Sequence, residues 1–470
     1  MIKKILILIS FSFQFLFGQN YGALRIANYA DDRQSAFSFT FDDGLKSQFD
    51  YAKPVLDNYG FKGTFYVLPP FLADNDQQTI WRYGTWPQFQ TLASDDHEIG
   101  SHTMNHDTLT LLPWGNINTQ GTLLYELYQS KNSIELKIPN SKCISFNYPY
   151  TIHDAEIDSA ASLFYEDARA SGQSANNPNI TGMEWYKLKA REVDFNLPRD
   201  SVEADLDELY AFLSWLNNAI SKKQWGILII HDVVPFNELQ PLIDDGVYQP
   251  VTTEWLGGLC DFLVAKSLNN TVWIETVGNI TRYIKERENA SYQILTSTNQ
   301  QIQINLTDNL DNTIYNFPLS AYVKIPDSWY YIRSEQSGKI DTLETSLTDS
   351  GRVVFVKIIP DGGILKLSPI SATDVNDQHL AVNQYKLYQN YPNPFNPSTR
   401  ISWQSPVSGW QSIKLYNTLG QEVDTIVDGY FEAGDHSKLY IINSALPSGI
   451  YFYQFKAGNY VETKKMILMK

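Results

Sequence analysis

Eight residues near the N-terminus read Phe37-Ser38-Phe39-Thr40-Phe41-Asp42-Asp43-Gly44. Aromatic residues alternate with small hydroxyl residues up to Phe41, which is typical of a buried β-strand. Two carboxylates follow at once, and Gly44 then allows the chain to turn. In folds built on parallel strands, active sites form at the carboxyl ends of those strands. The run therefore predicts a strand that delivers Asp42 and Asp43 to a site, although an acidic turn without function has the same appearance.

Strand-like and helix-like segments alternate over residues 25–287, which indicates a parallel sheet with crossover helices and, most simply, a barrel. A region of about 260 residues suits one such barrel. We expect strands at residues 36–41, 63–68, 98–101, 142–148, 163–168, 186–190, 225–230 and 271–275. We expect helices at residues 47–58, 122–136, 201–221 and 253–267.

Two further regions contain strand patterns without helix signals. Residues 290–372 are rich in Thr, Ser, Asn and Gln with alternating apolar positions, which predicts a small β-sandwich. A polar connector follows, and residues 385–470 then form a second β module with Gly-containing turns. Taken alone, this last module also fits a carbohydrate-binding domain. The fold class is therefore α/β, a barrel followed by two small all-β sandwich domains.

Charge and the N-terminal segment limit the partners and the compartment. The formal net charge of −16 argues against nucleic acid, which needs a basic face. Residues 1–19 begin with two lysines and continue with a short apolar run, the pattern of a signal peptide. No later run of 18 apolar residues occurs, so we expect an exported protein without a stable transmembrane anchor. Cys143 and Cys260 are predicted to be buried thiols, with one disulfide bond left open.

A second informative stretch reads Ser101-His102-Thr103-Met104-Asn105-His106. A spacing of four places His102 and His106 on one face of a helical turn, where both imidazoles can share one metal ion. With a carboxylate from the first stretch they would form a site with two histidines, one carboxylate and open positions. Such a pair also occurs without any metal, but three of the seven histidines, His97 among them, fall within residues 97–106.

A third apolar run, residues 225–230, ends in His231. A lone histidine at a strand end also fits a packed or capping residue. Three strand ends that carry two aspartates, two histidines and one histidine nevertheless supply what metal-assisted hydrolysis of an acyl bond requires. These are a Lewis acid, a carboxylate that deprotonates water and an imidazole that protonates the leaving group.

The motifs Thr40–Gly44, Ser101–His106, Tyr148-Pro149-Tyr150 and Ile229-Ile230-His231 resemble those of the polysaccharide deacetylase family, the NodB homology domain of carbohydrate esterase family 4. The resemblance covers about residues 30–287. It implies a distorted (β/α)7-type barrel, a divalent metal that is usually Zn²⁺, and an acetylated polysaccharide or oligosaccharide as substrate.

The resemblance also implies a role for each matching residue. Asp43, His102 and His106 would bind the metal, and Asp42 would be the base that acts on water. The two remaining catalytic groups would be His231, as the acid toward the leaving amine, and the backbone N–H of Tyr150, as a donor to the oxyanion.

One departure concerns the arginine that usually opens the third motif, because this chain has Asn147 there. The fourth motif also lacks its tryptophan, and an alanine-arginine pair ends the strand instead. We hypothesise that Arg169 takes the place of the missing arginine in space. The alternative is a surface ion pair of Arg169 with Glu166 or Asp167.

The C-terminal module is similar to the type A sorting domain of type IX secretion. The similarity rests on residues 391–397, 413–423, 446–451 and 464–468. It implies that the type IX secretion machinery exports the chain from the periplasm across the outer membrane, to the medium or the cell surface.

The sequence as a whole predicts a secreted, metal-dependent polysaccharide deacetylase that removes N-acetyl groups, with removal of O-acetyl groups as the less favoured alternative. Two rivals remain: a metal-dependent amidase acting on a non-sugar C–N bond, and a catalytically silent glycan-binding protein. Aromatic residues near the motifs are candidates for stacking on sugar rings, although most tryptophans in such a domain belong to the core. They are Trp81, Tyr83, Trp86, Tyr148, Tyr150 and Trp185.

Overall fold

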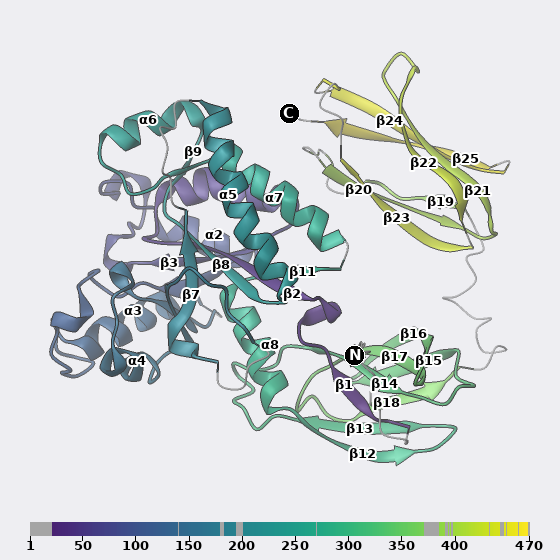
Figure 1. Ribbon diagram of the computed structural model, residues 1–470, viewed down its shortest axis with the longest axis horizontal. Coiled ribbons are helices and arrows are strands. Elements are labelled where there is room, and N and C mark those ends of the chain that lie inside the picture. The colour runs from purple at the N-terminus through teal and green to yellow at the C-terminus, as the bar shows by residue number, and fades with distance from the viewer. Residues whose placement is uncertain are drawn as a thin grey trace, which may run out of the picture.

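The computed structural model describes residues 21–468, apart from residues 140, 179–182, 194–200, 269, 371–384, 391–392, 394, 396–397, 432, 442–445, 448 and 459. The predicted signal peptide and the polar connector lie outside the described residues. Figure 1 shows an α/β region and two all-β regions. Among the described helices, none is both long and apolar enough to cross a membrane.

Seven parallel strands form a closed barrel within the described residues, because β8 pairs back onto β2. The strands follow one another around the barrel in chain order. Their bounds are β2 Ser35–Phe41, β3 Gly63–Val67, β4 Glu98–Ser101, β5 Ser145–Asn147, β6 Asp167–Ser171, β7 Leu188–Glu192 and β8 Trp225–Ile230. The predicted barrel fold is confirmed.

The barrel is distorted at β2. One edge of β2 pairs with β8 along residues 36–41. The other edge is divided: β11 (Val272–Ile274) pairs with its first half at residues 35–37, and β3 pairs with its second half at residues 39–41. Strand β2 is buried at every position, and the rings of Phe41 and Phe65 stack with centroids 4.6 Å apart. The carboxyl end of β2 is therefore held firmly by neighbours on both sides.

The helices cover the outside of this barrel (Figure 1). They are α1 Lys53–Tyr59, α2 Trp86–Ser94, α3 Leu123–Lys137, α4 Ala155–Ala161, α5 Val202–Ser221, α6 Phe236–Asp244, α7 Thr253–Leu268 and α8 Val277–Asn289, and a π-helical turn, Gln48–Ala52, precedes α1. The four predicted helices are confirmed. The strand predicted at 163–168 was wrong at its start, because Leu163 lies in the turn after α4 and is 60% exposed. Cys143 and Cys260 are both buried and free, as predicted.

The middle region is an antiparallel sheet of eight strands among the residues described, in the order β1-β14-β17-β16-β15-β18-β13-β12. Strand β16 pairs with β15 through residues 339–344 and with β17 through residues 345–348, so the sheet folds over along β16. Strand β1 precedes the barrel in sequence but pairs with β14. The bounds are β1 Leu24–Ile26, β12 Ser291–Ser297, β13 Ile302–Thr307, β14 Leu319–Lys324, β15 Tyr331–Gln336, β16 Lys339–Thr348, β17 Gly351–Ile358 and β18 Leu365–Pro369.

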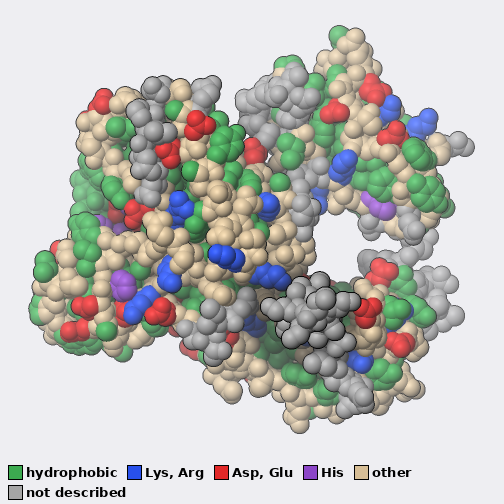
Figure 2. Space-filling model, viewed as in Figure 1, with side chains coloured by type: hydrophobic (Ala, Val, Ile, Leu, Met, Phe, Trp, Pro, Cys, Tyr) green, Lys and Arg blue, Asp and Glu red, His purple; other side chains and the backbone are tan. Residues whose placement is uncertain are grey.

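The C-terminal region consists of two antiparallel sheets, in the described orders β19-β20-β23 and β22-β21-β24-β25. Its buried cluster contains residues from Leu387 to Leu468 only. Hydrophobic side chains, green in Figure 2, gather on this region near Tyr430. The strands are β19 Lys386–Leu387, β20 Ser398–Ser405, β21 Gly409–Tyr416, β22 Glu422–Phe431, β23 Gly434–Ile441, β24 Gly449–Ala457 and β25 Tyr460–Leu468.

A polar cluster lies at the amino ends of the barrel strands. The Ser145 hydroxyl lies 2.7 Å from Glu98 Oε1 and 3.1 Å from Asp167 Oδ2, and the Thr281 hydroxyl donates to Asp167 Oδ2 at 2.8 Å. Asp167 Oδ1 is buried and has no hydrogen-bond partner among the described residues. Burial, together with the nearby charge of Glu98, raises the pKa of Asp167 to about 8. Asp167 is therefore protonated in the folded protein at neutral pH.

This raised pKa makes a prediction about stability. Between the ordinary carboxyl pKa near 4 and about 8, the folded chain keeps a proton that the unfolded chain has lost, so the free energy of unfolding falls as pH rises. We expect the Asp167→Asn variant to lack this part of the slope. Between pH 5 and pH 8, the free energy of unfolding of the variant should rise by about 1.4 kcal/mol or more relative to that of the original protein. Urea unfolding of the barrel measures this difference. Parallel pH profiles of the two proteins would contradict this expectation.

Candidate metal and catalytic site

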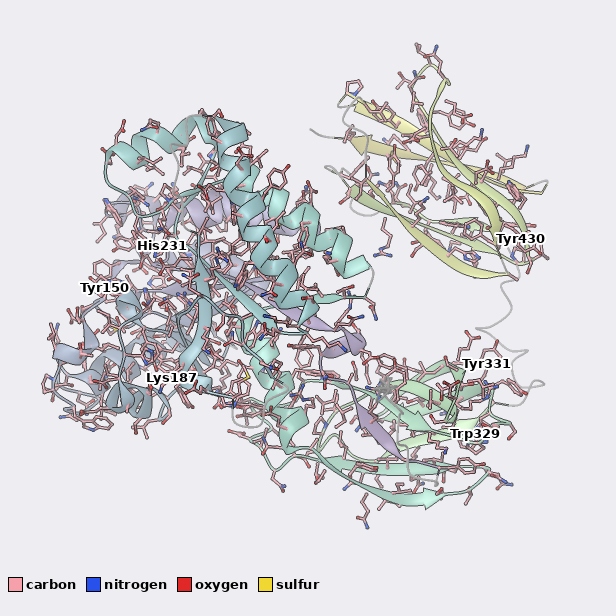
Figure 3. The ribbon with its side chains drawn as sticks, in the orientation of Figure 1. Tyr150, Lys187, His231, Trp329, Tyr331 and Tyr430 are labelled. Carbon is pink, nitrogen blue, oxygen red and sulfur yellow. The ribbon has the colours of Figure 1, made fainter. Side chains whose placement is uncertain are left out.

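The carboxyl ends of β2, β4, β5, β7 and β8 surround one cavity of about 440 Å³. Figure 3 shows Tyr150 and His231 on the same side of the barrel. The residues lining the cavity are Asp42, Asp43, His102, His106, Tyr148, Tyr150, Thr151, Glu192, Ile229, His231 and Tyr248. The three sequence stretches with titratable groups therefore meet at one place.

Asp43, His102 and His106 form a triangle of donor atoms. Asp43 Oδ1 lies 3.4 Å from His102 Nε2 and 3.7 Å from His106 Nε2, and the two Nε2 atoms are 3.2 Å apart. Donors that each lie about 2.0–2.2 Å from one zinc ion in tetrahedral geometry are separated by roughly 3.3 Å. The donor set thus has the chemistry and the spacing of a candidate metal site.

The imidazole of His102 is oriented for this purpose. Its Nδ1 lies 2.9 Å from the carbonyl oxygen of Asn147, so Nδ1–H donates to that oxygen and Nε2 faces the triangle. Burial and the adjacent His102 lower the pKa of His106 to about 4, which leaves this ring neutral and able to ligate. Burial alone would raise the pKa of Asp43, but the hydrogen bond to His102 and the nearby histidines hold it well below its usual range. The triangle therefore offers two imidazole nitrogens and one carboxylate oxygen as donor atoms.

The helical turn predicted for His102 and His106 is wrong. Both residues lie in an irregular loop after β4, and Thr103 and His106 have positive φ angles of 72° and 59°. Glu126 of α3 holds the loop, because its carboxylate accepts hydrogen bonds from the backbone N–H groups of Met104 and Asn105, at 3.0 and 2.8 Å. The buried Glu126 thus shapes the loop that brings the two imidazoles together.

Asp42 lies beside this triangle and is paired with Arg169. Arg169 Nη2 donates to Asp42 Oδ1 at 2.6 Å and also contacts Oδ2. The arginine is fully buried, so the alternative of a surface ion pair is wrong. Arg169 on β6 is the register partner of Asn147 on β5. An arginine is therefore present at the same level of the barrel as Asn147, one strand further along, and it contacts the predicted base.

His231 follows β8, and its Nε2 lies 3.9 Å from Asp42 Oδ2. The ring of His231 meets the ring of Tyr248 edge to face, with centroids 5.2 Å apart. The Tyr248 hydroxyl donates to Glu192 Oε2 at 2.6 Å, so these two residues form one wall of the cavity. Tyr150 stands at the rim with a positive φ of 56° and is 59% exposed.

Sequence reasoning missed Glu126, Glu192 and Tyr248. Each is an ordinary residue in its local stretch, and none lies in a recognisable motif.

The aromatic residues predicted as candidates for sugar stacking lie in three kinds of place. Tyr148 and Tyr150 line the cavity, Trp81 and Tyr83 lie in an adjoining loop, and Trp86 and Trp185 pack against the core.

Comparison with known families identifies two regions. The profile of the polysaccharide deacetylase family matches residues 30–166, and that of the secretion system C-terminal sorting domain matches residues 389–469. The chain therefore carries a polysaccharide deacetylase domain and a sorting domain for export by type IX secretion. The first match includes Asp42, the donor triangle and Tyr150, whereas Arg169 and His231 lie beyond it.

Individual relatives and solved structures share low sequence identity with this chain. A gellan lyase from Bacillus is 27% identical over 379 residues, a region that covers 78% of this chain and only 14% of the lyase. A polysaccharide deacetylase from Bacillus cereus is 13% identical with a TM-score of 0.33, covering 52% of this chain and 91% of that one. The peptidoglycan deacetylase PdaC from Bacillus subtilis is 18% identical with a TM-score of 0.32, covering 54% and 94%.

Proposed function

We propose that this protein is a secreted, metal-dependent polysaccharide deacetylase. Its preferred substrates are N-acetyl groups, and O-acetyl groups are the alternative. The observation that carries the proposal is the donor triangle of Asp43, His102 and His106 beside Asp42 and His231 in one cavity. The deacetylase and sorting domains support the same reading.

The triangle would hold one divalent ion, and Zn²⁺ is the first choice because two of the three donors are imidazoles. When bound, such an ion polarises a carbonyl oxygen and lowers the pKa of a coordinated water molecule. Three protein ligands leave open positions for water and for the acetyl oxygen. The protein itself has to supply the base, the acid and the positioning of the substrate.

Asp42 is our choice for the base that takes a proton from the attacking water. It is only 4% exposed, and Arg169 orients its carboxylate from the side of β6. Arg169 is fully buried and does not line the cavity that contains the donor triangle. It therefore acts through Asp42 as a positioning residue.

His231 is our choice for the acid that donates a proton to the leaving nitrogen. Water adds to the acetyl carbon, the C–N bond breaks, and a free amine leaves together with acetic acid, which ionises to acetate in solution. One proton of the water goes to Asp42, and the imidazolium proton of His231 goes to the amine. The backbone N–H of Tyr150, at the rim of the cavity, would donate to the oxyanion during this step.

Acetate release tests this proposal. The purified protein should release acetate from chitin oligomers, peptidoglycan or acetylxylan, and chelation should remove the activity until a divalent ion is added back. The chelated protein is the matched control. Hydrolysis of small non-sugar amides without acetate release from any glycan would favour the rival amidase. Glycan binding without turnover, in a metal-loaded protein, would favour the silent binding protein.

A further inference from the structure

The turn Pro149–Thr151, which carries the proposed oxyanion donor, is strained at two consecutive residues. Tyr150 and Thr151 have positive φ angles of 56° and 58°, a conformation that is uncommon for residues other than glycine. Burial of Tyr150 does not compensate, because this residue is 59% exposed. Strain of this kind persists only where the surrounding structure holds the backbone in place. Contacts of the residues that flank the turn therefore have to fix its conformation.

A single carboxylate oxygen joins the residues on the two sides of this turn. The hydroxyl of Tyr148, which precedes the turn, donates a hydrogen bond to Asp158 Oδ1 at 2.9 Å. His153 follows the turn, and its Nδ1 lies 2.7 Å from the same oxygen. A carboxylate oxygen only accepts, so His153 Nδ1 carries the hydrogen. The imidazole also stacks on the Tyr148 ring, with centroids 4.7 Å apart and an angle of 14° between the planes.

Asp158 and Tyr148 are themselves held firmly. Asp158 lies on α4 and is 8% exposed, and the side chain of Asp154 caps the start of this helix. Lys187 Nζ lies 3.5 Å from Asp158 Oδ2. Tyr148 is completely buried, and burial together with the charge of Asp158 raises the pKa of its hydroxyl well above the ordinary value. The hydroxyl therefore keeps its proton and remains a hydrogen-bond donor.

The turn is adjacent to the donor triangle, whereas the residues that tie its two sides are not. The Tyr150 ring meets the His106 ring edge to face, with centroids 4.6 Å apart. Tyr148 and Tyr150 line the cavity that contains the triangle, but His153 and Asp158 do not. Any influence of His153 and Asp158 on the reaction has to pass through the turn. Nothing in the reaction proposed above uses this pair.

We propose that His153 and Asp158 are positioning residues, which together hold the turn after Tyr148 so that the backbone N–H of Tyr150 meets the oxyanion. This inference rests on the proposed deacetylase function. A donor to the oxyanion contributes in the transition state and little to binding of the ground state. Loosening the pair should therefore lower kcat and leave KM nearly unchanged, whereas a general weakening of the fold would not separate the two constants in this way.

Kinetics of Asp158 variants test the positioning role. On whichever of chitin tetramer, peptidoglycan or acetylxylan the original protein deacetylates, Asp158→Ala should lower kcat about 10-fold and change KM less than about twofold. Asp158→Asn should recover most of kcat, because its amide oxygen can still accept both hydrogen bonds. The matched control is Asp57→Ala, which breaks a second histidine–carboxylate pair away from the cavity, with His97 Nε2 3.2 Å from Asp57 Oδ1. Unchanged kcat in Asp158→Ala would overturn the inference.

Hydrogen exchange separates the inference from the proposed reaction, because it needs no substrate. In the full-length, metal-loaded protein, backbone amides of residues 149–153 should exchange about 10-fold faster after Asp158→Ala, and at the original rate after Asp57→Ala. If Asp158→Ala fails to fold, His153→Ala serves the same purpose, since the His153 side chain is 20% exposed. An unchanged exchange rate would overturn the inference even if turnover fell. A protein that releases no acetate from any of the three glycans would refute the deacetylase proposal, and exchange would still decide whether the pair holds the turn.

Discussion

The double variant His102→Ala, His106→Ala is expected to contain no divalent ion after purification and to release no acetate above background. The original protein should carry about one ion per chain. Two of the three donors in the triangle are removed, and one carboxylate alone does not hold a zinc ion against water. Metal content by elemental analysis and acetate release on the same samples are the two measurements.

A control histidine separates metal binding from the general loss of an imidazole. His436 lies in strand β23 of the C-terminal region, outside the candidate site, so His436→Ala should leave metal content and turnover unchanged. The circular dichroism spectrum of the double variant should remain that of the original protein, because the loop is held by Glu126 rather than by the histidines. Full occupancy of the double variant would show that the ion binds elsewhere.

The sequence was sufficient to locate the strand ends of the site, because each is a local pattern. The alternation from Phe37 to Phe41 predicts β2, and the acidic pair that follows predicts where its carboxyl end lies. The apolar run before His231 does the same for β8. Parallel strands present these ends on one face of the barrel, so the convergence follows from fold class alone.

The geometry of the histidine loop was not accessible in the same way. A spacing of four predicts a helical turn, but contacts with Glu126 determine the conformation of the loop. Glu126 lies about 20 residues later in the chain, on another element. The partnership of Arg169 with Asp42 likewise depends on the register between β5 and β6, which places Arg169 level with Asn147. Register across a barrel is a tertiary property, and no local pattern encodes it.

Strand β1 shows the same limitation at the level of domains. Its three residues, Leu24–Ile26, carry no distinct pattern, and they pair with β14, almost 300 residues further along the chain. A short strand becomes a strand only because a neighbour supplies its hydrogen bonds. A cavity of about 300 Å³ lined by Asp43, Trp81 and His231 shows the same limitation, since four separate segments of the chain build its wall.

The neighbouring aspartates should respond oppositely to the same substitution. Asp42→Asn is expected to keep the metal ion but to lose about 10²- to 10⁴-fold in kcat, as for a removed general base. Asp43→Asn should weaken metal binding, with part of the activity restored at high metal concentration. The reason is position: Asp43 Oδ1 faces both imidazoles, whereas Asp42 is held by Arg169 and lies 3.9 Å from His231 Nε2.

The Asp42 variant needs a stability measurement, because it leaves the charge of Arg169 buried without its partner, a change that commonly costs about 3–5 kcal/mol. A loss of kcat caused by unfolding would lower metal content as well, whereas loss of the base leaves the ion in place. Double substitution of Asp42 by Asn and Arg169 by Met removes both charges and should recover stability without recovering turnover. A metal-free Asp42→Asn protein beside a metal-loaded Asp43→Asn protein, both folded, would mean that the two roles are reversed.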